Sequence, residues 1–151
     1  MTRSARLTRH WLTLLVVLLI TSFTAQARPY GDIEQQRIER AFPAQDAVSA
    51  PDGPFKVRTI STAGKPIGYV FQSLDVVAIP AYSGKPINTL VILDAAGVIR
   101  DAYVLEHHEP ILLIGIPEVK LHEFTAHYSG VDVRQRVVVG RSSDPKAVTV
   151  D

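Results

Sequence analysis

Alternating apolar and polar positions in the middle of the chain predict β-strands that pair as hairpins. The first two strands are separated by Gly64–Pro66, a sequence typical of a turn. The next two are separated by Asp94–Gly97, which is also a tight-turn sequence. A β-branched run before this second turn is typical of a buried strand. The predicted strands are Phe55–Ile60, Ile67–Phe71, Asn88–Leu93 and Val98–Leu105.

A short helix is predicted ahead of the strands. Asp32, followed three residues later by Gln35, has the spacing of a capping box and predicts a helix over Glu34–Phe42. Pro43 would end this helix, and Ala44–Pro54 has the composition of a loop. The apolar face of the helix is expected to consist of Ile38, Ala41 and Phe42.

A second helix is predicted beyond the hairpins. Pro117 suits a first helical turn, Gly130 suits the residue after a helix C-terminus, and Val131–Gly140 resumes a β-strand composition. The apolar face of this helix is expected to consist of Leu121, Phe124, Thr125 and Tyr128. These elements predict an α+β fold, in which an antiparallel, twisted sheet carries one or two packed helices.

The first 27 residues have the order of a secretory signal peptide. Three arginines without an acidic residue come first, an apolar run over Trp11–Phe23 follows, and Ala25–Ala27 supplies the small-x-small cleavage pattern. The apolar run is shorter than the ~20 residues that span a bilayer. We therefore expect cleavage after Ala27 and one periplasmic domain over residues 28–151, with an uncleaved N-terminal anchor as the alternative.

Composition narrows the classes of function. The formal net charge of +1 gives no electrostatic footprint of a nucleic-acid-binding protein. The chain contains no cysteine, which excludes disulfides, thiolate metal sites and cysteine nucleophiles within it. A chain of this composition can fold in an oxidising compartment without mispaired cysteines.

His122, Glu123 and His127 are the first candidates for chemistry. A zinc-protease helix carries HExxH because histidines four residues apart share one helix face. These histidines are five residues apart, which separates their rings by about 140° around a helix. We therefore expect two solvent-facing histidines on an amphipathic helix and no zinc pair.

His107, His108 and Glu109 form a second polar group, expected where Pro110 ends a strand. Side chains at such an edge often bind ligands, and imidazole titrates near neutrality. Taken alone, however, the group is more typical of a polar surface. A hydrolase using either histidine lacks a nucleophile motif such as GxSxG, and we rank it last.

Tyr82–Pro86 is the third candidate, and it contains Gly-Lys without the pattern of a phosphate-binding loop. Gly84 permits close approach of the backbone to a ligand, and Ser83 and Lys85 offer donors to an anion. Tyr82 offers a ring that can stack on a planar ligand. Taken alone, the segment is more typical of a turn between strands.

In their order along the chain, these segments resemble the FMN-binding domain of the NosR/NirI family. The tyrosine–serine–glycine segment and the stretch EHHEPI…IGIPE are the specific part of the resemblance, which covers about residues 32–151. The matching segments are Gly68–Phe71, Tyr82–Ile87, Asn88–Asp94, Gly97–Ile99, Leu105–Ile111 and Ile114–Glu118.

The resemblance implies a domain that holds FMN outside the cytoplasmic membrane and serves electron transfer. NosR-like proteins support nitrous oxide reduction, through electron supply to the reductase and expression of its genes. The role implied is that of an electron-transfer component more than a stand-alone enzyme, with redox proteins of the cell envelope as partners. The implied flavin-binding residues are Tyr82, Ser83, Gly84, Lys85, Pro86, His108, Glu109, Pro110 and Gly115.

The chain departs from the family pattern at its C-terminus. Relatives commonly attach the FMN phosphate to the threonine of a Ser-Gly-Ala-Thr motif, which this sequence lacks. Thr149 lies in a different context, and Asp151 resembles the residue that opens the attachment segment. We therefore expect a fragment or truncated frame without covalent flavin, with weakened FMN binding.

Two further expectations follow from this departure. Membrane association would come from the N-terminal segment or from a missing C-terminal region. The alternative to a flavin carrier is a periplasmic regulatory or interaction module that keeps the fold without redox chemistry.

Overall fold

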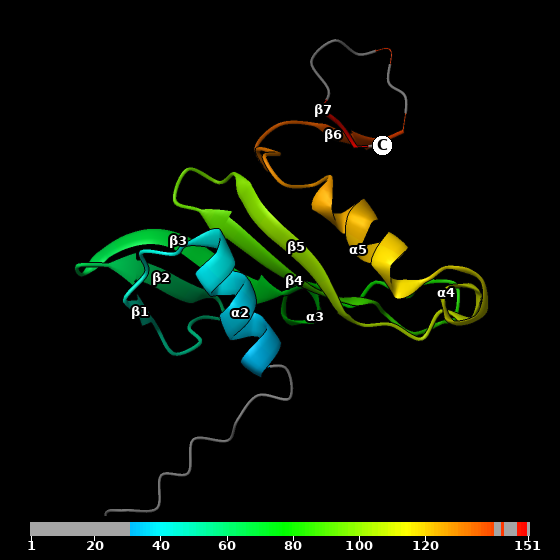
Figure 1. The fold of residues 1–151 in the computed structure, drawn as a ribbon, viewed down its shortest axis with the longest axis horizontal. Helices are drawn as coiled ribbons and strands as arrows, with labels where there is room; N and C mark the ends of the chain where they lie inside the picture. The colour runs from blue at the N-terminus through cyan, green and yellow to red at the C-terminus, as the bar shows by residue number, and fades with distance from the viewer. Residues whose placement is uncertain (1–30, 141–142, 144–147, 151) are drawn as a thin grey trace, which may run out of the picture.

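A computed structural model describes residues 31–140, 143 and 148–150. Its main feature is a five-stranded antiparallel sheet in which each strand pairs with the next in sequence (Figure 1). The predicted α+β class is confirmed, whereas the predicted signal peptide lies outside the described residues. The helices are α2 (Gly31–Ala41), α3 (Ser73–Val76), α4 (Pro110–Gly115) and α5 (Glu118–Ala126). The strands are β1 (Ala47–Val48), β2 (Arg58–Thr62), β3 (Lys65–Gln72), β4 (Asn88–Asp94), β5 (Ile99–Glu106), β6 (Val137–Val139) and β7 (Val148–Val150).

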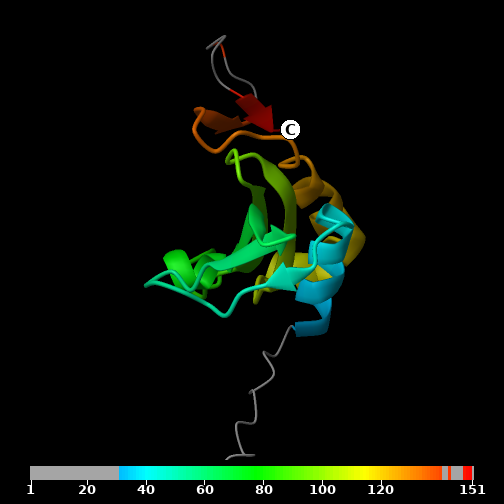
Figure 2. The same ribbon diagram turned by 90° about the vertical axis from the view of Figure 1, so that its left-hand side faces the viewer.

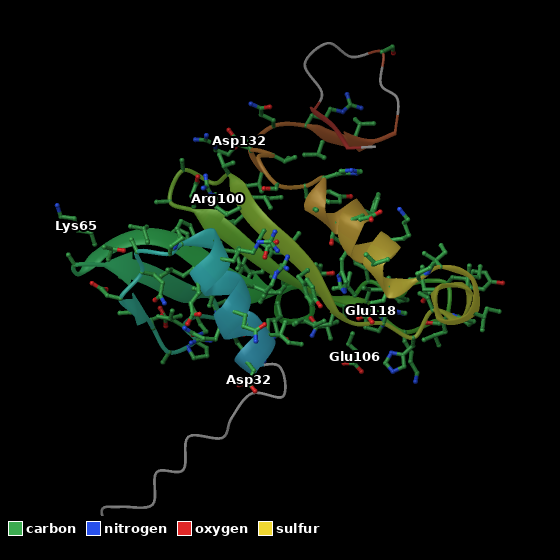
Figure 3. All side chains as sticks on the ribbon, in the orientation of Figure 1. Asp32, Lys65, Arg100, Glu106, Glu118 and Asp132 are labelled. Atoms are coloured by element: carbon green, nitrogen blue, oxygen red, sulfur yellow. The ribbon has the colours of Figure 1, made fainter. Side chains whose placement is uncertain are left out.

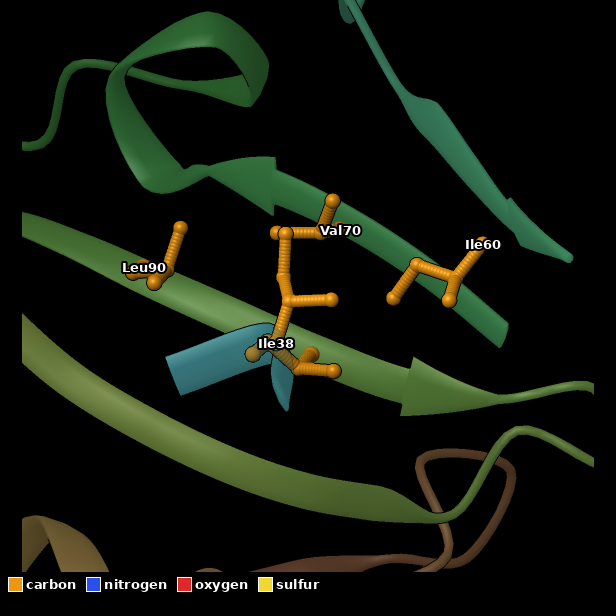
Figure 4. Packing of buried hydrophobic residues seen from close by; sticks show 5 residues of the cluster. Ile38, Ile60, Val70 and Leu90 are labelled. Carbon is orange, nitrogen blue, oxygen red and sulfur yellow. The ribbon is translucent and has the colours of Figure 1, made fainter. Parts of the chain in front are cut away.

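The core forms where α2 packs on the sheet. Each core side chain is at most 1% exposed, and those on the strands share one face because side chains alternate along a strand. Full burial of each aliphatic group stabilises the fold by about 1.5–3 kcal/mol. Ala41 and Phe42 pack against this core, so the predicted apolar face of the first helix is confirmed. The core residues are Ile38, Ile60, Val70, Leu90 and Ile92 (Figure 4).

Two ion pairs fix α2 to strands on either side of the core. Arg58 of β2 donates a hydrogen bond to Glu34, which is almost fully buried. Arg37 donates from Nε and Nη2 to the two carboxylate oxygens of Asp101 on β5, each at 2.6 Å. The Arg37 guanidinium also lies 4.4 Å from the centroid of the Tyr103 ring. The helix is therefore held by charge as well as by apolar packing.

The helix α5 lies on the same side of the sheet as α2 (Figure 2). The predicted face of this helix is partly wrong, because Phe124 is exposed and His122 occupies an inner position. The His122 ring stacks on Tyr103 with centroids 4.0 Å apart and planes 8° apart. Tyr103 thus offers an aromatic surface that a helical pattern alone does not reveal. The expectation that His122 faces solvent is therefore wrong, whereas His127 is exposed.

Three predictions near the N-terminal helix are wrong. The helix begins at Gly31, so Asp32 lies within its first turn, and the Gln35 side chain donates to Glu39 instead of closing a capping box. The predicted loop Ala44–Pro54 contains β1, whose two residues pair with β2. The strand expected from Phe55 begins at Arg58, because a turn closed by an antiparallel bridge between Asp52 and Val57 precedes it.

The first hairpin turns one residue earlier than predicted. Ala63 and Gly64 form the turn, with φ values of 49° and 72°. Positive φ at both central positions is the pattern of a type I′ two-residue loop, whose twist matches that of the paired strands. Lys65 therefore already belongs to β3, where it pairs with Thr62. The second predicted hairpin is confirmed as β4 and β5.

The segment that follows α5 packs beside the start of β5. Gly130 donates to the carbonyl of Ile99, and the carbonyl of Val131 accepts from Ile99, each at 2.8 Å. Gly130 has φ +88° but lies beyond the His127 cap, so it is not the residue directly after the α5 C-terminus. Of the predicted β region Val131–Gly140, only β6 is a strand. No helix in the described part of the chain is both long and apolar enough to cross a membrane.

Gly68 is needed because a side chain there would collide with its surroundings. A Cβ atom would lie 2.6 Å from the Leu93 carbonyl oxygen and 2.7 Å from the Phe42 ring. We expect Gly68→Ala to lower the free energy of unfolding by about 1–3 kcal/mol, measured by urea denaturation. Gly115→Ala is the matched control, because the space around that Cβ is open. Equal stability of the two variants would contradict this packing.

Asp132 is held by Arg134 in the loop between α5 and β6. The Arg134 side chain donates to both carboxylate oxygens at 2.8 and 2.7 Å, and its backbone N–H donates at 3.0 Å. These hydrogen bonds lower the pKa of Asp132 from 3.8 to about 2. The stability that they contribute is therefore fully present above pH 3.8 and is lost as the pH falls towards 2.

We expect Arg134→Ala to raise the pKa of Asp132 towards its ordinary value, because the two hydrogen bonds that the Arg134 side chain donates to the carboxylate disappear. Carboxyl ¹³C NMR across an acid titration measures this pKa directly. Lys120→Ala is the control, because Lys120 pairs with Glu123 on α5. A pKa of Asp132 that stays near 2 without Arg134 would show that another group lowers it.

Candidate functional site

The loop between α3 and β4 is closed by its own backbone. Pro80 and Pro86 face each other in an isolated antiparallel bridge, and Ala81 N–H donates to the Lys85 carbonyl at 3.0 Å. Gly84 has φ +77°, a conformation that glycine adopts without steric cost. The predicted segment Tyr82–Pro86 is therefore a compact turn with a fixed shape.

A short helix, α4, begins at Pro110, where the sequence predicts only the end of a strand. Pro110 is the first residue of α4, a position that tolerates its missing N–H, and the Glu109 carbonyl accepts from Leu113 N–H at 3.1 Å. The stretch from Pro110 to Pro117 carries no charged residue. This uncharged run was the available signal, but it shows no helical period because nearly every position is apolar.

The register of the second hairpin brings these two segments together. Asn88, the first residue of β4, pairs with Glu106, the last residue of β5. The loop that enters β4 and the loop that leaves β5 therefore start from the same end of the sheet. In Figure 1 the loop after α3 runs towards α4, at the end of the molecule away from β6 and β7.

A buried carboxylate joins the two segments directly. The Glu109 Oε1 atom accepts a hydrogen bond from the Ser83 backbone N–H at 3.1 Å, and Glu109 is only 8% exposed. A carboxylate removed from water needs such a donor, because burying it without a partner is costly. The Ser83 hydroxyl in turn accepts from Lys85 N–H at 3.2 Å. Residues 26 positions apart thus form one local structure.

Exposed apolar side chains surround this junction. Tyr82 is 85% exposed, and a Cβ atom on Gly115 would meet no atom within 4 Å. Exposed patches of this kind on soluble proteins mark surfaces that bind a ligand or a partner. We call the exposed aliphatic residues of this region the α4 surface; they are Ile111, Leu113, Ile114 and Ile116.

The two adjacent histidines have different surroundings. His108 is exposed, and its Nε2 lies 3.6 Å from Glu106 Oε1. His107 is half-buried, and its Nδ1 has no hydrogen-bond partner among the described residues. His107, Glu118 and Leu121 line cavities of about 290 and 270 Å³ beneath α4 and α5. Figure 3 places Glu106 and Glu118 at this end of the molecule.

The sequence does not predict that His107 and Glu118 line a cavity. The resemblance implied His108, which lies at the surface beside Glu106, and gave no role to His107. The sequence alone could not predict that His107 lies beside α5, because the two are brought together only by tertiary packing. Among the described residues, no group of three or more His, Asp or Glu side chains could hold a metal ion.

Comparison with known proteins gives relatives but no family model that matches the chain. The chain is 59% identical over 135 residues to the regulatory protein NosR of Pseudomonas aeruginosa, covering 89% of this chain and 19% of that protein. It is 56% identical over 138 residues to NosR of Stutzerimonas stutzeri, covering 91% and 19%. It is 27% identical over 130 residues to protein NirI of Paracoccus denitrificans, covering 85% and 19%.

These identities confirm the resemblance to the NosR/NirI family. The chain is a homologue of one region of these proteins, and it spans about a fifth of the length of the curated relatives it matches.

The contact between Glu109 and Ser83 can be tested by hydrogen exchange. We expect Glu109→Ala to speed exchange of the Ser83 amide roughly 10- to 100-fold, because a hydrogen bond to a charged acceptor contributes about 1.5–3 kcal/mol. Glu123→Ala is the control, since its exposed side chain pairs with Lys120. Unchanged exchange at Ser83 in Glu109→Ala would show that the carboxylate does not hold the loop.

Proposed function

We propose that this chain forms a periplasmic flavin-holding domain of a NosR-like protein, exported through residues 1–27. The observation that carries the proposal is the hydrogen bond from Ser83 to the buried Glu109. It fixes Tyr82 and the N-terminus of α4 to one end of the sheet. This contact supports a single site that contains both segments that the family resemblance implies for FMN.

The chemical character of this site suits FMN. A flavin has a planar aromatic ring system, a polar chain and a phosphate, and when bound it transfers electrons one or two at a time. Tyr82 offers a ring for stacking, and the α4 surface offers aliphatic contacts that exclude water. Lys85 is exposed on the same loop and supplies a positive charge for the phosphate.

Each residue then has a limited role. Glu109 keeps the loop in place and does not face the ligand, because it is buried and occupied by Ser83. Gly84 allows the loop to turn, and the open space at Gly115 allows a ring to approach α4. His108 would act at the rim, where it is exposed beside Glu106. Electron exchange with proteins of the cell envelope would follow from the exposed position of the site.

A non-redox regulatory or interaction module is the second candidate. The α4 surface would also suit a protein partner, because interface centres are apolar and exposed before binding. Two of the relatives carry the name of a regulatory protein. This candidate keeps the fold and the Glu109 contact but assigns the exposed side chains to a protein surface.

Titration of FMN into the purified chain, followed by flavin fluorescence and by retention through desalting, tests the proposal. We expect saturable binding that Tyr82→Ala weakens about 2- to 12-fold, because aromatic stacking contributes about 0.5–1.5 kcal/mol. Tyr82→Phe keeps the ring and is the matched control, with affinity close to that of the unaltered chain.

Riboflavin separates ring recognition from phosphate recognition. Lys85→Gln should weaken FMN binding but leave riboflavin binding unchanged, because riboflavin lacks the phosphate. A well-folded chain that binds neither flavin saturably would overturn the flavin proposal and favour the regulatory module.

A further inference from the structure

A third cavity forms a groove between α2, β5 and α5. Its volume is about 700 Å³. In Figure 3 the Arg100 label lies near the C-terminal end of α2, and residues of both elements line this groove. The lining residues that matter for its chemistry are Arg37, Arg40, Arg100, Asp101, His122 and Glu123.

The groove carries positive charge that its own carboxylates do not neutralise. Arg37 is engaged by Asp101 through two hydrogen bonds, and the Glu123 carboxylate is engaged by Lys120 at 2.6 Å. Arg40 and Arg100 make no ion pair with any described residue. Two of the arginines that line this cavity therefore have no carboxylate partner among the described residues.

The walls of the groove are fixed by internal contacts. Arg37 and Arg40 lie three positions apart on one face of α2, and the Arg37–Asp101 pair sets the distance between that face and β5. On the opposite wall, Ser129 donates to the Arg100 carbonyl at 3.2 Å, which holds the backbone that carries the second free guanidinium. A rigid site loses less entropy when it binds a ligand.

We propose that this groove is a binding site for a small oxyanion that carries phosphate or carboxylate groups. Arg40 and Arg100 are the residues that hold it, because the guanidinium fork matches both kinds of anion with paired hydrogen bonds. His122 lines the same cavity from α5 and adds an imidazole to the wall. The site is separate from the Tyr82 loop and does not depend on flavin binding.

NMR titration of the ¹⁵N-labelled chain with inorganic pyrophosphate, and separately with citrate, tests this site. We expect saturable shifts at the amides of Arg100, Ser129 and Gly130, weakened by rising salt because exposed charges are screened. The double variant Arg40→Gln/Arg100→Gln should weaken binding at least tenfold. The probe that binds more tightly identifies phosphate or carboxylate as the preferred group.

Arg134→Gln is the matched control, because Arg134 is an exposed arginine that pairs with Asp132 outside the groove. Equal weakening by this control, or absence of saturable shifts with both probes, would overturn the proposal. If the double variant does not fold, the single variant Arg100→Gln replaces it. Weaker probe binding by this variant, together with shifts at the groove in the unaltered chain, would support the proposal, and unchanged binding would overturn it. Loss of FMN binding would leave these shifts in place, so the two proposals fail separately.

Discussion

The packing of α2 across the sheet is the interaction on which the rest of the structure depends. Ile38 fills the centre of the core, and ion pairs to Arg58 and Asp101 fix the helix to β2 and β5. Removing one partner of a buried ion pair typically costs about 3–5 kcal/mol. The helix therefore cannot leave the sheet without losing apolar and charged contacts together. This arrangement fixes β4 and β5, from whose ends the candidate site is built.

The candidate site follows from the register of these two strands. Pairing of Asn88 with Glu106 places the loop before β4 beside the segment after β5. The Glu109 carboxylate then holds the Ser83 amide, so that two segments become one surface. The two NosR relatives are 56–59% identical to this chain over about nine-tenths of its length. Two features therefore assemble the candidate site, namely the pairing of Asn88 with Glu106 and the hydrogen bond between Glu109 and Ser83.

Much of the sheet could be predicted because its strands alternate between a buried and an exposed face. The hairpin over Asn88–Leu105 agrees with β4 and β5. The helix α4 could not be predicted, because a uniformly apolar run has no period. The family resemblance predicts Ser83 and Glu109 as site residues. Their contact with each other depends on the register of β4 and β5, which cannot be predicted from the positions of the residues in the sequence. The inner position of His122 depends on the ring of Tyr103, which only tertiary packing supplies.

The most direct test of the account is an NMR map of FMN binding to the ¹⁵N-labelled chain. If Glu109 joins the Tyr82 loop and α4 into one flavin site, the shifts will concentrate at Ser83, Gly84 and the amides of Leu113–Gly115. Core amides of α2 and β3 will stay unchanged. Saturable shifts confined to another part of the described chain, or no shifts in a well-folded sample, would contradict it.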